Sequence, residues 1–483
     1  MLTSNANGDS RLPLWLRVRE YAVPPSMIET STARRSAGDW AGACAAARVD
    51  VDLDLRTVAR AHGRELAALV RADLRRLAPD LLRWHLPRIA PDGLLRPGLT
   101  VSLARYAGGG GDGHGGDGGH PVHLVARTPP AWADAGQRIS LTLWDGFRPG
   151  SGTGAHPHPH PRPDRRFRLD LHRHLWDAHR SGELRTRSGA DLDLDLNRDL
   201  DRDLDPDRDP LGLVPPGRGC AIDRWGAEAG ILLRAEGRTT GTVTVRVGSR
   251  HRLDLVLGAD GRGDGPPVWR VAAPSGTRGA PALPLLPDAA TWVPPDLELI
   301  RAGLIGADRL HPLVASALVP ELVADLAPAG ATAGGERAGR PRLVDCRGAL
   351  HRIGQVDGVL VPLDHGPDEI RREGLLAALT GAPLPCLRVI DETHRRPDGL
   401  TEVRERLDHG DAAGALDVVE GLLGPGALLR DGPLRDELET AALRAITHGL
   451  FRAGLVGPGP GRIRAGEARP RNHRSRPRTT HAR

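Results

Sequence analysis

The sequence contains no lysine, and all 66 basic residues among its 483 are arginine. Lysine contacts the phosphates in a Walker A loop, forms the Schiff base of pyridoxal-phosphate enzymes, and acts in protein kinases and SxxK hydrolases. We therefore do not expect these classes of enzyme. A genome of very high GC content, which favours arginine codons over lysine codons, accounts for the absence. It also makes each biased tract suspect as mutational drift.

Cysteine is scarce as well, since it occurs only at Cys44, Cys220, Cys346 and Cys386, with no CxxC pair. This spacing predicts neither a disulfide framework nor a cysteine-rich zinc module. No apolar run approaches the roughly 18 residues of a membrane span, and the first residues lack the order of a signal peptide. We therefore expect a cytoplasmic protein with no membrane partner. The sequence also has no GxSxG and no HExxH motif, the signatures of many serine hydrolases and zincins.

Glycine and proline are abundant instead, with 61 and 42 residues, and many of them lie in segments without an apolar period. These segments predict two disordered loops (107–120 and 149–164), an Asp-rich low-complexity linker (188–216), a second linker (328–341) and a disordered Arg-rich tail (457–483). Between them we expect three folded domains, at residues 10–187, 217–327 and 342–456.

The apolar patterns predict an α+β fold, with helices packed on antiparallel meander and hairpin sheets and a mainly helical C-terminal domain. Helical periodicity extends from Pro24 to Pro87 and predicts a buried face made of Leu66, Leu69, Val70, Leu74 and Leu77. Period-two alternation then predicts meander strands at 99–103, 122–124, 139–143 and 167–171. No βαβ period recurs, which favours α+β over a parallel sheet.

The second domain is predicted to contain a helix and a β-hairpin. The helix lies within the segment from Ala221 to Glu236, with Asp223 as N-cap and Gly237 as the stop signal. The hairpin covers 242–257, where two alternating apolar segments flank a glycine-containing turn. The third domain, 342–456, begins with short strands and continues with helices.

One short motif, GDxAGA, occurs twice, within Ser36–Ala47 and within Asp408–Val419. At each place the first glycine can end a helix, and the aspartate can cap the next. Helical hairpins of the tetratricopeptide kind use a similar turn, but stacked repeats need about three neighbours. The motif predicts a local helix–turn–helix at both places, and a true repeat relationship stays open.

The strongest metal candidate is Asp170, His172 and His174 in the segment FRLDLHRHLWDAHR. On a strand these three side chains share one face, and two imidazoles with a carboxylate could hold Zn or Fe(II). If the chain turns helical at Leu171, the two histidines point apart. Exposed histidines are the preferred interpretation of this segment.

A second group is Cys346, His351, Asp364 and His365, in which a cysteine and histidines could form a metal site or a thiolate–imidazole pair. The CxxxxH spacing of Cys346 and His351 is poor for zinc, because no CxxC or HxxxH pair follows to supply the other two ligands. A buried strand cysteine beside loop histidines is the preferred interpretation. The run HPHPHP from His156 to Pro161 is a low-complexity tract to which we assign no function.

The run DLDLDLNRDLDRDLDPDRDP from Asp191 to Pro210 alternates aspartate with other residues. An EF-hand loop starting at Asp191 would need glycine at 196 and glutamate at 202, but the chain has Leu196 and Arg202. The run is therefore interpreted as an expanded, solvated loop. The shorter alternation VDVDLDL from Val49 to Leu55 predicts a half-buried strand.

Two stretches, LPLWLRVREYAVPPSMIETSTARRSAGDWAGACAAARVDVDLDL and LRVIDETHRRPDGLTEVRERLDHGDAAGALDVVEGLLGP, carry a resemblance. They resemble parts of an uncharacterised protein family from high-GC, Streptomyces-type actinomycetes. The resemblance implies no activity and no catalytic residues.

Three hypotheses of function follow. The preferred one is a cytoplasmic, non-enzymatic scaffold that binds an unknown protein partner through helical hairpins, with no cofactor. The second is a metal-dependent enzyme that uses Asp170, His172 and His174 with Zn or Fe. The third is a nucleic-acid accessory protein that binds through the tail 457–483, which holds eight arginines and one glutamate.

Overall fold

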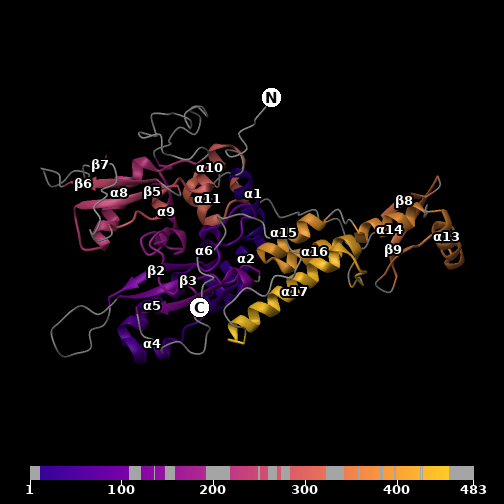
Figure 1. Ribbon diagram of the computed structural model, residues 1–483, viewed down its shortest axis with the longest axis horizontal. Helices are drawn as coiled ribbons and strands as arrows, with labels where there is room; N and C mark the ends of the chain where they lie inside the picture. The colour runs from indigo at the N-terminus through magenta and orange to yellow at the C-terminus, as the bar shows by residue number, and fades with distance from the viewer. Residues whose placement is uncertain are drawn as a thin grey trace. The chain divides into compact units, whose positions relative to one another are not determined.

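The computed structural model describes residues 11–107, 121–134, 136–146, 158–191, 218–248, 251–258, 269–272, 283–321, 342–346, 348–356, 359–380, 384–395, 399–424, 426 and 428–455. They divide into two compact units, an N-terminal unit (1–132 and 138–327) and a C-terminal unit (mainly 328–458). Helices and small sheets occur in both, so the α+β class is confirmed (Figure 1).

The first sheet of the N-terminal unit has the strand order β1-β4-β3-β2. Strands β2 (Thr100–Tyr106), β3 (Val122–Arg127) and β4 (Ile139–Trp144) form the predicted antiparallel meander. The predicted strand at 167–171 is wrong, because the segment forms only one bridge to β2, between Arg168 and Ser102. Strand β1 (Val49–Val51), which the short alternation predicted, lies at the other edge and is parallel to β4.

Helices alternate with the strands along the chain of this unit. The described ones are α1 (Arg11–Tyr21), α2 (Pro25–Ser36), α3 (Trp40–Ala46), α4 (Leu55–His62), α5 (Arg64–Arg76), α6 (Pro79–His85), α7 (Leu184–Ser188), α8 (Ile222–Ala235), α9 (Asp288–Thr291), α10 (Pro295–Arg301) and α11 (Pro312–Leu318). Among the described residues, no helix is long and apolar enough to cross a bilayer.

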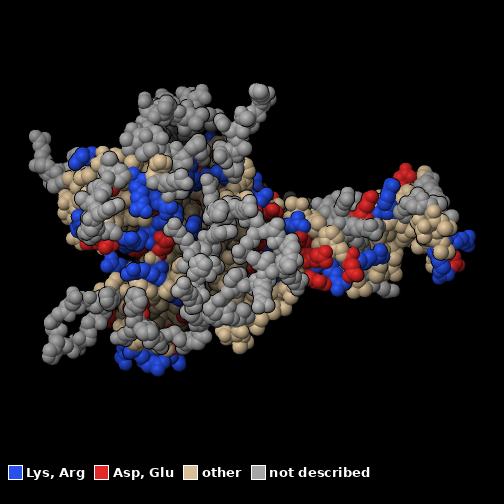
Figure 2. All heavy atoms as spheres, in the orientation of Figure 1, with Lys and Arg blue, Asp and Glu red and all other residues tan. Residues whose placement is uncertain are grey.

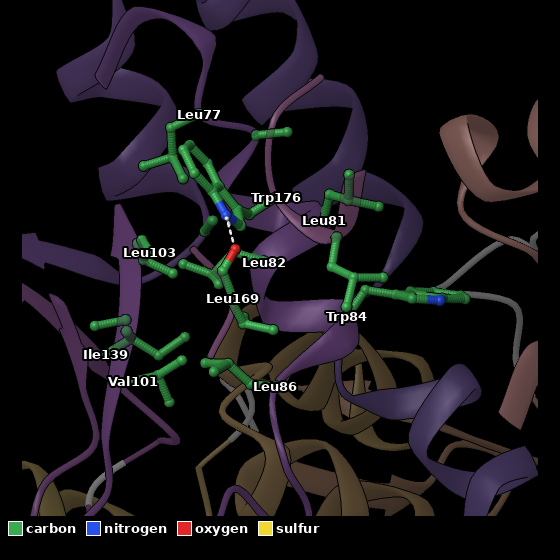
Figure 3. Close-up of a cluster of buried hydrophobic side chains, with 14 of the residues drawn as sticks. Leu77, Leu81, Leu82, Trp84, Leu86, Val101, Leu103, Ile139, Leu169 and Trp176 are labelled. Atoms are coloured by element: carbon green, nitrogen blue, oxygen red, sulfur yellow. Dashed lines mark hydrogen bonds between the residues drawn. The ribbon is translucent and has the colours of Figure 1, made fainter. Parts of the chain in front are cut away.

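The main core lies between the sheet and helices α5 and α6 (Figure 3). Trp176 is fully buried at its centre, and its Nε1–H donates a hydrogen bond of 3.0 Å to the Leu169 carbonyl oxygen. Around it lie side chains from α5, α6 and the strands, including Leu82, Leu103 and Ile139. The tryptophan thus buries a large apolar surface without leaving its one donor unpaired.

Four of the five residues of the predicted face on α5 are buried, but Leu69 is 55% exposed, so that part of the prediction is wrong. Successive residues of an α-helix are separated by about 100°, which places Leu69 at the margin of a face centred between Val70 and Leu77. Asp73 takes the place nearer the centre. It is buried and accepts a hydrogen bond from the Tyr106 hydroxyl.

The second sheet confirms the predicted hairpin. Strands β5 (Gly241–Val247) and β6 (His251–Leu257) pair antiparallel and bury their apolar alternate residues, and β7 (Trp269–Ala272) adds a third strand. Helix α8 ends before Gly237 as predicted, with the glycine φ at +73°. Asp223 is not the N-cap, because α8 begins at Ile222, two residues before the predicted start, and Ala221 occupies the N-cap position. Asp223 lies in the first turn, where its charge favours the helix dipole.

The residues of the first two predicted domains lie in one unit, because buried polar contacts join them. The Arg19 guanidinium pairs with Asp296 at 2.7 Å, and Asp80 contacts His311 Nε2 at 3.0 Å. Burial raises the pKa of the Asp80 carboxyl, but the hydrogen bond and the charge of His311 together with the charge of Arg35 outweigh burial and leave the pKa below its usual range. These pairs connect α1 and α6 with the segment that contains α10 and α11.

The C-terminal unit begins with the antiparallel strands β8 (Arg342–Cys346), β9 (Ala349–Val356) and β10 (Val359–Pro362). Five helices follow: α13 (Pro367–Thr380), α14 (Pro385–Arg395), α15 (Leu400–His409), α16 (Ala412–Leu423) and α17 (Pro433–Arg452). The predicted order of short strands and then helices is confirmed.

Both GDxAGA motifs form the predicted helix–turn–helix. Asp39 and Asp411 are the N-caps of α3 and α16, and each carboxylate accepts a hydrogen bond from the backbone N–H three residues on, at Gly42 and Gly414. A Cβ atom on Gly414 would lie 2.2 Å from the Asp411 carboxylate. The second glycine of the motif therefore makes room for the cap.

Several predicted segments fall wholly or mainly outside the described residues, namely the loop 107–120, the linkers 188–216 and 328–341 and the tail 457–483. Of the Asp-rich run, only Asp191 is described, and it pairs with Arg224. The predicted loop 149–164 is described from residue 158 onward. There His158 lies 2.9 Å from the Thr128 carbonyl oxygen, so this end of the loop packs against the unit.

Candidate metal centre

Three side chains of the C-terminal unit bring metal-binding atoms together. One ligand atom each of Cys346, His365 and Cys386 lies within 4.8 Å of the other two, which is close enough to hold one metal ion. The Cys386 sulfur and His365 Nε2 are 3.6 Å apart. Cys386 is fully buried and Cys346 is 3% exposed, so the group lies inside the unit.

The local structure explains how distant residues meet. Cys346 is the last residue of β8, His365 follows β10 in a turn, and Cys386 is the second residue of α14. Strand β9 pairs with both β8 and β10, so the three strands form one small sheet. Cys346 ends one strand of this sheet, and His365 follows another. Helix α14 packs on this sheet and brings in Cys386.

Burial affects the proton affinity of the Cys386 thiol. Burial first, and then the neighbouring Cys346 sulfur, raises the pKa of the Cys386 thiol to about 11. Without a metal, Cys386 is therefore a thiol at neutral pH. A divalent cation would reverse this preference, because a coordinating thiol loses its proton.

The outer ring nitrogen of His365 faces a carboxylate. His365 Nδ1 lies 3.2 Å from Glu369 Oε1, one turn into α13, and the contact with His365 lowers the pKa of the Glu369 carboxyl. A carboxylate behind a ligating histidine fixes the ring and the tautomer in many metal sites. Nε2 is then the nitrogen that faces the two sulfurs.

The predicted group around Cys346 is brought together only in part. The His351 ring stacks on the His365 ring at 4.3 Å, and its Nδ1 is buried without a hydrogen-bond partner. Asp364 points elsewhere and binds the Arg352 guanidinium, which lowers the pKa of this carboxyl to about 2. Cys386, 21 residues after His365, was missed. In the sequence, only the scarcity of cysteine could have marked Cys386 as a candidate ligand.

The donor set fits zinc. Two thiolates and an imidazole are ligands that zinc prefers, and a fourth ligand completes the usual tetrahedron. The buried, unpartnered His351 nitrogen lies beside the group. This chemistry is softer than the carboxylate and carbonyl oxygens that suit magnesium or calcium.

The other predicted candidates, Asp170, His172 and His174, lie in the N-terminal unit. Asp170 and His172 contact other side chains, and His174 lies in a helical turn instead of on a strand. Asp170 pairs with Arg168 at 2.7 Å, and His172 Nε2 lies 3.2 Å from Glu228. His172 and His174 have ring centroids 5.8 Å apart. His174 belongs to the short 3-10 helix η2 (Arg173–Leu175), so the shared strand face on which the hypothesis depended is not formed. Both histidines are buried, so the interpretation of His172 and His174 as exposed histidines is wrong as well.

Comparison of the chain with models of known protein families, with curated proteins and with solved structures gave no match. The interpretation of the candidate metal centre therefore rests on the chemistry of these side chains.

Proposed function

We propose that this protein is a non-enzymatic scaffold whose C-terminal unit folds around one zinc ion held by Cys346, His365 and Cys386. The observation that carries the proposal is the convergence of their three ligand atoms within 4.8 Å. Two sulfurs and one ring nitrogen supply a donor set that zinc binds tightly.

A structural role for the zinc is favoured by the size of the surrounding core. The cluster of buried residues at the site has five members, and two of them are Cys346 and Cys386 themselves. Small cores rarely stabilise a fold without an additional crosslink. A zinc ion would connect β8, the turn after β10 and the first turn of α14, and would thereby supply such a crosslink.

The first test is the zinc content of the purified protein. We expect about one zinc per chain by elemental analysis. Cys346→Ser or Cys386→Ser should lower the zinc affinity at least ten-fold, because each substitution removes one of the three proposed zinc ligands. Cys220→Ser is the matched control, because Cys220 lies in the other unit. Wild-type protein without zinc after growth and purification in zinc would contradict the proposal, as would an equal loss in the control.

The scaffold role is supported by a second observation on α17. The first half of this helix packs on the unit through Leu434 and Leu438. Leu443, Ile446 and Leu450 form a row on the opposite side and are 63%, 59% and 39% exposed. An apolar row with this i, i+3, i+7 spacing matches the contact face of a paired helix.

We infer that the occupant of this row is a second copy of α17 in antiparallel orientation. A two-fold axis beside Ile446 places Leu443 of one copy opposite Leu450 of the other, so that the apolar row of each copy covers the row of its partner. The chain would then act as a dimeric scaffold.

Sedimentation velocity tests the pairing. Wild-type protein is expected to sediment as a dimer, and Ile446→Glu with Leu450→Glu to weaken the dimer on the order of 100-fold, because buried apolar area is replaced by charge in both copies. Leu69→Glu, at an exposed leucine of the other unit, is the control and should leave the dimer intact. A wild-type monomer throughout the micromolar range would reject the pairing.

A further inference from the structure

The N-terminal unit contains a cavity with an unusual charge. Its volume is about 270 Å³, and it lies where α1, the end of α6, η2, α7 and α9 meet. Six arginines line it: Arg11, Arg88, Arg96, Arg166, Arg187 and Arg218. Among the described residues of the lining, Asp288 is the single acidic one. The surface view shows patches of arginine on the visible face of the same unit (Figure 2).

Part of this positive charge is compensated by carboxylates. Arg166 pairs with Asp288 at 2.7 Å, and Arg187 pairs with Glu228 behind the cavity wall. Arg11 is 3.7 Å from Glu298, so these ion pairs involve three of the six lining arginines. The lining therefore keeps an excess of positive charge.

Arg218 is the clearest member of this excess. Its guanidinium lies 3.5 Å from the ring centroid of Trp292, and its buried Nε has no hydrogen-bond partner. Burial, followed by the charge of Arg11, lowers the pKa of Arg218 to about 9. Burial and then the charge of Arg166 likewise lower the pKa of Arg96. Like charges are thus crowded where a bound anion would relieve them.

The remaining wall is mainly apolar and includes a few neutral polar side chains. Trp15, Phe167 and Trp292 supply aromatic surface. His174 is 3% exposed, and its Nδ1 is buried without a hydrogen-bond partner. Burial, and then the proximity of His172, lowers the pKa of His174, so the ring is neutral and can donate or accept one hydrogen bond.

We propose that this cavity binds a small organic anion: a phosphate or carboxylate group attached to a planar ring. The guanidinium groups match the geometry of either anion, and the tryptophan and phenylalanine side chains contact the ring. A concave site with mainly apolar walls and a few convergent polar groups is the usual form of a small-molecule site. The cavity volume of about 270 Å³ suits a ligand of this size.

The test is isothermal titration calorimetry of the full chain with four separate ligands: phenyl phosphate, benzoate, inorganic phosphate and phenol. We expect at least one of the two ring-bearing anions to bind at least ten-fold more tightly than inorganic phosphate and than phenol. Arg218→Gln is expected to weaken this binding at least ten-fold. The control is Arg60→Gln, since Arg60 is exposed on α4 and contacts only its own helix through Thr57. The control should bind like wild type.

Arg96→Gln is a second variant in case Arg218→Gln fails to fold, and it is expected to weaken binding as well because Arg96 also lines the cavity. Thermal melting of each variant without ligand checks the fold. The proposal is overturned if neither ring-bearing anion binds better than inorganic phosphate, or if folded Arg218→Gln or Arg96→Gln binds like wild type. Preference for phenyl phosphate or for benzoate assigns the anionic group.

Discussion

Removal of zinc by a chelator is expected to unfold the part of the C-terminal unit that contains β8, β9 and α14, and to leave the N-terminal unit folded. Zinc binding supplies about 10 to 16 kcal/mol in small zinc domains, as much as the whole stability of an average domain. Here the ligands join a strand end, a turn and a helix around a core of five buried residues. Without the ion, the two buried cysteines would contribute little more than packing.

Hydrogen exchange measured with and without the chelator checks this result. Backbone amides of β8, β9 and α14 should lose most of their protection, while those of the meander β2–β4 in the other unit should keep theirs. Readdition of zinc should restore protection. Unchanged exchange in β8, β9 and α14 after verified loss of zinc would show that the ion does not hold this unit.

The same experiment has a defined pH dependence. Because the pKa of the Cys386 thiol is raised to about 11 without metal, zinc must displace its proton at every pH below that value. Zinc affinity should therefore fall as the pH is lowered, by about ten-fold per pH unit for each thiol proton released. Less chelator should be needed to unfold the unit at pH 6 than at pH 8.

Asp296→Ala is expected to destabilise the N-terminal unit by about 3 to 5 kcal/mol. The Arg19 and Asp296 side chains are 1% and 0% exposed, and they form two hydrogen bonds of 2.7 and 2.9 Å. Asp296 also accepts from Trp84 Nε1, and the Arg19 guanidinium lies over the Trp84 ring. Alanine would leave a guanidinium buried with no counter-charge.

Chemical denaturation measures the effect as a shift of the midpoint at constant slope. Arg19→Met combined with Asp296→Leu should recover much of the lost stability, since removal of both charges leaves none unpaired. Glu183→Ala breaks an exposed pair with Arg180 and should cost less than about 1 kcal/mol. A loss below about 1 kcal/mol on Asp296→Ala would show that Arg19 is solvated.

Local patterns in the sequence were sufficient wherever neighbouring residues decide the conformation. Alternate valines and leucines specify the hairpin β5–β6, because one face of a strand must be buried. The two GDxAGA motifs specify their turns through a glycine, a capping aspartate and a second glycine that clears the cap. Each of these features spans fewer than about 20 residues of chain.

The apolar periodicity led to wrong predictions where tertiary packing places the side chains differently. The alternation at Phe167, Leu169 and Leu171 suggested a strand, but Phe167 and Leu169 fill the main core from an irregular segment. In that segment most backbone N–H groups bond to nearby carbonyl oxygens, and Asp170 bonds to β2. Leu69 satisfied the helical spacing yet lies outside the contact, because Asp73 occupies the inner position with Tyr106 and Arg173 as partners. Spacing alone does not fix the centre of a buried face.

By itself, the sequence determined the α+β class, the hairpin and the helical turns. Tertiary structure alone decided the two candidate sites. Cys346 and Cys386 are 40 residues apart and meet because α14 packs on the small sheet. The six arginines of the cavity come from residues 11 to 218 and gather because several elements converge there. Such sites depend on long-range packing, which no local period of residues encodes.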